Sequence, residues 1–214
     1  RFLALAPALR GEVPVLIRAR GAEAVRSSLA WALGLGVRSV LVGGDGAESC
    51  IPFLAQHAVP VIVTGTLRLP SRDDDPYDAA FALPAALAAA KIPFCIAGDG
   101  GHSNVRNLAQ HAATAVAFGL DRATAERAIT SAAAAILGVG DELGAIERGK
   151  RATLFLAKGD PFEIESRVVA AWIDGRRIDL ANKQTRLAEK YREKYRQLGL
   201  WPAADGSTQE PVRR

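Results

Sequence analysis

The chain has 214 residues, of which 49% are hydrophobic and 23% charged, and its formal net charge is +4. This composition is ordinary for one or two globular domains, and it excludes a mainly disordered chain, a collagen-like chain and, with two cysteines, a disulfide scaffold. No run approaches the roughly 18 apolar residues that a membrane-spanning helix needs. The sequence has no methionine, so we expect the natural N-terminus to lie upstream of Arg1.

In the first half of the chain, short apolar runs alternate with helical patterns. The runs occupy 13–19, 39–44, 59–65 and 92–98, and the helical patterns 21–36, 48–57, 79–90 and 104–118. Continuously apolar runs are typical of strands that are buried on both faces. Their alternation with helices predicts parallel βα units.

The pattern changes in the second half. Asp121 has the character of an N-cap for a helix that we expect to reach Leu137. A strand is expected at 152–157, and a hairpin at 168–180 is indicated by an Asp-Gly pair between apolar runs. A basic helix at 185–198 follows, and we expect a stripe with Tyr191 and Tyr195 to dock it against the protein while its charged face is solvated.

Two glycine-rich segments resemble nucleotide-binding loops without meeting their requirements. In 144–151, Arg151 stands where a phosphate-binding loop needs a hydroxyl, and a strand follows where a helix is needed. After the second apolar run, Ser49 occupies the third glycine position of a dinucleotide turn. We favour neither site. His57 and His111 fall inside predicted helices, where a structural role is favoured.

The segment from Gly98 to Asn104 has the residue types of a functional site. It follows an apolar strand and contains Asp99, His102 and three glycines. Sites in parallel α/β folds form at the carboxyl ends of the strands. The alternative, that Asp99 and Ser103 are only turn and cap residues, stays open.

Several motifs in order resemble the C-terminal signature of the amidohydrolase superfamily, of the imidazolonepropionase and dihydroorotase type. They are Gly119-Leu120, Ala128-Ile129-Thr130, Ala135 to Gly138, Gly149 to Ala152, Gly159-Asp160-Pro161 and Trp172 to Arg176. The resemblance implies the C-terminal half of a metal-dependent (β/α)₈ barrel in 1–143 and part of a composite β-sandwich domain in 144–181. A charged helix and tail would then occupy 182–214.

The resemblance also implies a site. Asp99 matches the family's metal-binding and catalytic aspartate, and zinc is the metal first expected. However, Arg18 stands at the strand-five ligand position, and Gly43 or Gly44 at the strand-six position. Neither residue type binds a cation, so a typical binuclear centre is not expected. Arg18 and Arg20 would instead favour an anionic group of the substrate, with His102 as a further substrate contact.

We therefore expect a hydrolase that acts on non-peptide carbon–nitrogen bonds of a small molecule. The alternative is a metal-depleted, non-catalytic barrel that binds an anionic small molecule or a partner. Expected partners are the substrate, the upstream half of the same barrel and further copies of the chain, with no nucleic acid and no membrane. A cytoplasmic location is expected.

Overall fold

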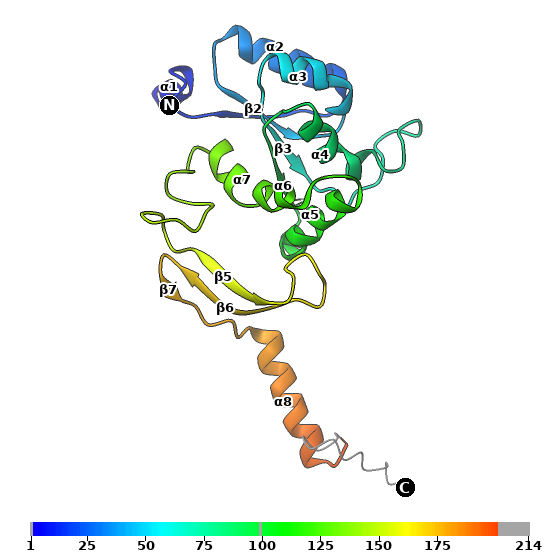
Figure 1. The fold of residues 1–214 in the computed structure, drawn as a ribbon, viewed down its shortest axis with the longest axis vertical. Coiled ribbons are helices and arrows are strands. Elements are labelled where there is room, and N and C mark those ends of the chain that lie inside the picture. Colours follow the sequence, from blue (N-terminus) through cyan, green and yellow to red (C-terminus); the bar gives the residue numbers. More distant parts are fainter. Residues whose placement is uncertain (1, 99, 201–214) are drawn as a thin grey trace.

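The computed structural model describes residues 2–98 and 100–200. A parallel sheet of four strands lies at the centre of the first part of the chain, with the strands side by side in sequence order (Figure 1). The strands are β1 (Val15–Arg18), β2 (Ser39–Gly43), β3 (Val61–Thr64) and β4 (Phe94–Ala97). The predicted parallel βα organisation is confirmed. The sheet stays open within the described residues, because β1 and β4 each have one neighbouring strand.

Helices connect the strands and follow the last one at the predicted places. They are α2 (Ala22–Gly34), η2 (Glu48–Cys50), α3 (Ile51–Gln56), α4 (Ala79–Ala89), η3 (His102–Asn107) and α5 (Leu108–Ala117). In α2 the buried residues are Val25, Leu29 and Ala32, which form the apolar stripe expected at helical spacing. Two short helices that the sequence pattern did not indicate, η1 (Phe2–Leu5) and α1 (Ala6–Leu9), precede β1.

The helix expected from Asp121 to Leu137 is two helices, α6 (Arg122–Ala128) and α7 (Ser131–Ile136). The N-cap is confirmed, since the Asp121 carboxylate accepts a hydrogen bond of 2.9 Å from the Thr124 amide. The break falls at Thr130, whose backbone is not helical. There Gly144 crosses the start of α7 so closely that a Cβ on it would lie 2.7 Å from the Ala134 side chain. A glycine therefore permits this crossing.

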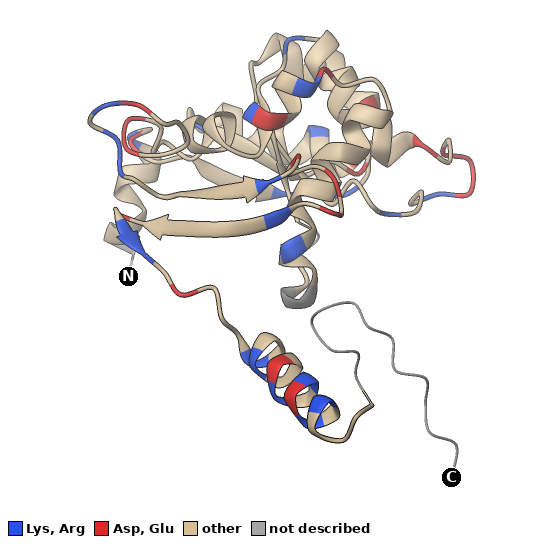
Figure 2. Cartoon of the chain, turned by 60° about the horizontal axis from the view of Figure 1, so that its bottom comes forward, with Lys and Arg blue, Asp and Glu red and all other residues tan. Residues whose placement is uncertain are grey.

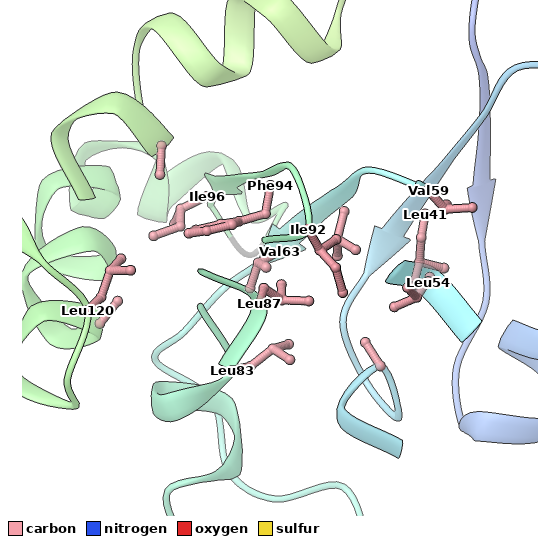
Figure 3. Packing of buried hydrophobic residues seen from close by; sticks show 14 of the residues in the cluster. Leu41, Leu54, Val59, Val63, Leu83, Leu87, Ile92, Phe94, Ile96 and Leu120 are labelled. Carbon is pink, nitrogen blue, oxygen red and sulfur yellow. The ribbon is translucent and has the colours of Figure 1, made fainter. Parts of the chain in front are cut away.

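Both faces of β2, β3 and β4 are buried, which explains why these strands are apolar, whereas the residues of β1 are partly buried or exposed. On one face, Leu41, Val63 and Phe94 pack against Leu83 and Leu87 of α4 and against the other connecting helices (Figure 3). The opposite face carries a second cluster, and α7 covers it. That cluster consists of Val40, Val42, Ile62, Cys95 and Ile136. Burial raises the pKa of the Cys95 thiol to about 11, and both cysteines are free.

The last part of the chain forms a small antiparallel sheet and a projecting helix (Figures 1 and 2). The sheet contains β5 (Leu154–Lys158), β6 (Arg167–Ile173) and β7 (Arg176–Arg177), and the predicted Asp-Gly turn joins the last two strands. Helix α8 (Lys183–Gln197) begins with a capping box formed by Asn182 and Thr185. Within the part of the chain that the structure describes, no helix combines the length and apolar character needed to cross a membrane.

One group of contacts ties the antiparallel sheet to the helices. Arg122 of α6 donates a hydrogen bond of 2.6 Å to Asp160 in the β5–β6 loop. Its guanidinium also lies 4.7 Å from the centre of the Phe162 ring, and Phe162 is buried in the helix-side core. The Arg122 guanidinium lowers the pKa of Asp160, assisted by the Phe162 amide. The loop is thus held by one ion pair and one buried ring.

We expect the ion pair between Arg122 and Asp160 to make the free energy of unfolding depend on pH. Because the pKa of Asp160 is lower in the folded chain than its usual 3.8, its contribution is present above that value and is lost as the pH falls through the folded pKa. The free energy of unfolding in urea, measured between about pH 6 and pH 3, should fall less steeply in Asp160→Asn. Arg122→Gln should remove the same part of the pH dependence, and an unchanged slope in both variants would contradict the assignment.

The core assignment makes a second prediction. Leu41 is fully buried, whereas Leu69 is 84% exposed. Leu41→Ala should therefore lower the free energy of unfolding by about 2 to 5 kcal/mol, through lost burial and the cavity left behind. The matched variant Leu69→Ala should change it by less than about 0.5 kcal/mol. Equal effects in urea denaturation would show that β2 is not packed as described.

Candidate functional site

The carboxyl ends of the four parallel strands meet at one edge of the sheet (Figure 1). Arg18, Gly43, Thr64 and Ala97 are the last residues of β1 to β4. Thr64 donates a hydrogen bond of 3.2 Å to the carbonyl of Gly43 and is paired in register with Ala97. Residues widely separated in the sequence are thereby placed along one edge.

Arg18 stands at this edge with its charge unpaired. Its neighbour Ile17 packs against the helix-side core, so Arg18 lies on the opposite face of the strand. Both Arg18 and Arg20 are exposed, and neither forms an ion pair or a side-chain hydrogen bond with another residue in 2–98 or 100–200. Two cationic groups are therefore available to an anion.

The glycine-rich turn after β2 is explained by packing. A Cβ on Gly46 would lie 2.6 Å from the Ala22 amide nitrogen and 2.8 Å from the Cα of Gly21. Gly21 also donates a hydrogen bond of 3.1 Å to the carbonyl of Asp45. The turn after β1 and the turn after β2 therefore touch backbone to backbone. This backbone contact explains why residue 46 is a glycine, so no bound nucleotide is needed to explain it.

His111 ties the loop after β3 to α5. Its side chain is 1% exposed, and its Nδ1 accepts a hydrogen bond of 3.3 Å from the Leu67 amide. The Thr66 hydroxyl, also buried, donates to the His111 carbonyl at 2.8 Å and lies 3.2 Å from Nδ1. The structural role favoured for His111 agrees with this position. The sequence analysis missed its partner, Thr66, whose only signal is its place two residues beyond a strand.

The remaining sequence-predicted residues follow β4. Asp99 lies outside the described residues. His102 begins η3 at the same edge, and its side chain also lies outside the described part. The topology therefore brings Arg18 and the start of η3 to one edge, and the roles of Asp99 and His102 stay predictions.

The described residues that end β1, β2 and β3 do not suit a divalent metal. Zinc takes thiolate, imidazole or carboxylate ligands, whereas Arg18, Gly43 and Thr64 end the first three strands. In the part of the chain that is described, no three histidine, cysteine, aspartate or glutamate side chains gather closely enough to hold a metal ion.

No protein-family model matches the chain, and no curated protein does. Solved structures do match. An amidohydrolase from Thermotoga maritima MSB8 is 26% identical, with a TM-score of 0.74, over 81% of this chain and 45% of that chain. A zinc-bound adenosine deaminase from Xanthomonas campestris is 23% identical, with a TM-score of 0.57, over 87% of this chain and 52% of that chain.

A prolidase complexed with N-methylphosphonate-L-proline is also similar, with 18% identity and a TM-score of 0.61 over 82% of this chain and 47% of that chain. The chain thus spans about half the length of the solved structures that it matches. The deaminase and the prolidase, at this identity, support the fold alone.

The tie between Thr66 and His111 can be tested by removing one hydroxyl. Thr66→Val keeps the shape of the side chain and leaves the buried His111 carbonyl without this donor, so the free energy of unfolding should fall by about 1 to 3 kcal/mol. Thr114→Val is the matched control, because the Thr114 hydroxyl bonds a carbonyl of its own helix at 2.8 Å. We expect a smaller loss in the control, and equal losses in urea denaturation would contradict the tie.

Proposed function

Because the chain belongs to the amidohydrolase superfamily, we propose that it forms part of a hydrolase that cleaves carbon–nitrogen bonds, other than ordinary peptide bonds, in an anionic small molecule. The observation that carries the proposal is the ordered parallel sheet, which superimposes on an amidohydrolase with a TM-score of 0.74 over 81% of the chain. The activity fits the edge where the strands end, since this is where sites of parallel α/β folds form.

The proposed architecture is that of the superfamily. The sheet β1-β2-β3-β4 supplies one half of a (β/α)₈ barrel across residues 1–143, and the open edges at β1 and β4 receive the other half. Residues 144–181 contribute to a small β domain. Supporting this division, the chain spans about half of each solved relative, and both edges of the parallel sheet are open in the described part.

In the proposed reaction, Asp99 is the general base and then the general acid. Its carboxylate takes a proton from the attacking water as the oxygen bonds to the substrate carbon. It then gives that proton to the nitrogen as the carbon–nitrogen bond breaks. The position of Asp99 in the sequence, two residues after the end of β4, supports this role, because sites of parallel α/β folds form where the strands end.

Arg18 is proposed to hold the anionic group of the substrate, with Arg20 and His102 nearby. An unpaired guanidinium binds a carboxylate or phosphate in a two-pronged geometry and keeps its charge at every relevant pH. The absence of an ion pair at Arg18 and Arg20 within the described residues supports this assignment.

A second candidate function is binding without catalysis. It is favoured by the same residues, because Arg18 and the glycines at the end of β2 replace the metal ligands that the superfamily resemblance implies. In that case the edge holds an anionic small molecule or a partner, and Asp99 is a turn residue.

Two substitutions separate the candidates. For the enzyme, Asp99→Asn should lower the rate about 10² to 10⁴-fold on any amide, lactam, cyclic imide or ester that the protein hydrolyses, because a general base is lost. Asp45→Asn, which changes a carboxylate at the same edge, should leave the rate within a fewfold. Arg18→Met should raise KM and leave kcat nearly unchanged.

Full activity in Asp99→Asn would exclude its catalytic role. A protein inactive on the whole panel that binds small carboxylates or phosphates, with binding lost in Arg18→Met, would support the second candidate.

A further inference from the structure

Helix α8 presents an apolar stripe that no other element among residues 2–98 and 100–200 buries, contrary to the expectation that its tyrosines dock it against the protein. The helix extends away from both sheets (Figures 1 and 2), and all of its residues are exposed. Leu187, Tyr191, Tyr195 and Leu198 follow one another at spacings of four, four and three residues, which places them on one side of a helix. The Tyr191 and Tyr195 ring centres are 6.3 Å apart. The stripe is thus a continuous apolar surface in contact with water.

Cationic side chains border this stripe, and the acidic ones lie behind it. The helical repeat of 3.6 residues puts Lys183, Lys190 and Lys194 along one border and Arg192 along the other. The Lys194 ammonium lies 5.9 Å from the centre of the Tyr191 ring. The same repeat places Glu189 and Glu193 on the opposite face. Six cationic and two acidic residues make up the charge of the helix.

Among the described residues, the ion pairs of α8 involve its far face and not the borders of the stripe. On the far face, Arg196 makes two hydrogen bonds of 3.0 Å to Glu193, and Arg186 lies 3.9 Å from Asp179. The border residues make no ion pair with any residue of 2–98 or 100–200. They are Lys183, Lys190, Arg192 and Lys194. The surface that faces the stripe must therefore be anionic if these charges are to be paired.

An apolar stripe with cationic borders favours some binding partners over others. Two α8 stripes facing each other would bring the border cations of both copies together, which is unfavourable. A nucleic acid would pair the charges but offers no aliphatic layer for Leu187 and Leu198. In an anionic bilayer, leucines enter the boundary of the acyl chains, tyrosines sit at headgroup level, and lysines extend to the phosphates.

We propose that α8 is an interfacial helix that binds an anionic lipid surface and lies in the plane of the headgroups. The sequence-based expectation of no membrane partner rests on the absence of a spanning segment, and an interfacial helix needs none. The proposal is independent of the hydrolase function, because α8 is separate from the strand ends (Figure 1).

The test is sedimentation of the 214-residue chain with vesicles. Vesicles of phosphatidylglycerol and phosphatidylcholine in equal parts should bind it, vesicles of phosphatidylcholine alone should not, and raised salt should weaken the binding. The double variant Lys190→Gln/Lys194→Gln should lower the partition constant on the order of tenfold or more, since both lysines face the surface. Leu187→Gln should also lower it, through lost apolar burial.

The matched control removes two charges from the far face of the same helix. Arg186→Gln/Arg196→Gln should lower the partition constant much less than the border variant, with circular dichroism confirming an unchanged helix in both. Equal losses in the two double variants would overturn the proposal, because they would indicate attraction by net charge alone. It would also be overturned by no binding, or by a dimer in analytical ultracentrifugation that Leu187→Gln abolishes.

Discussion

The structure depends on burying both faces of a parallel sheet with one chain. The connecting helices cover one face, and their apolar stripes meet Leu41, Val63 and Phe94. The opposite face still carries Val42 and other apolar residues, so a second element has to cover it. The chain covers this face because the helical segment after Asp121 breaks at Thr130, between α6 and α7, and α7 packs on that face. The break, the close crossing of Gly144 and the position of the second sheet all follow from this requirement.

A few specific contacts, and not an extensive core, join the antiparallel sheet to the rest of the molecule. A buried ring, Phe162, and an ion pair between Arg122 and Asp160 join the β5–β6 loop to α6. Within the small sheet, a second pair at 2.7 Å joins Arg151, which precedes β5, to Asp174 in the β6–β7 turn. These pairs are largely exposed and so contribute modestly, whereas the ring adds apolar burial. The antiparallel sheet is therefore positioned by a few specific contacts, and the parallel sheet by an extensive core.

The strand ends combine a fold similar to that of a solved amidohydrolase with described residues that do not suit a divalent metal. Backbone packing explains the glycine at position 46, and the tie between Thr66 and His111 holds the loop after β3. The charge at Arg18 has no such structural explanation, because it forms no ion pair within the described residues. An exposed, unpaired guanidinium at the edge where sites form is what makes an anionic substrate or ligand the better proposal. Helix α8 likewise carries exposed cations without an ion pair in the described residues, because lysines border its apolar stripe.

The sequence by itself determined the elements whose signals are local. The apolar runs located all four parallel strands, Asp121 marked a real N-cap, and the Asp-Gly pair marked the hairpin, because strand burial, capping and turn geometry are encoded within a few residues. It also placed Arg18 at the end of a strand. Only the tertiary structure decided that the helix after Asp121 breaks at Thr130 and that Thr66 meets His111 across 45 residues. It alone showed that the cations beside the stripe of α8 form no ion pair with the residues that the structure describes. Each of these depends on which distant segment packs against a residue, and no local pattern carries that information.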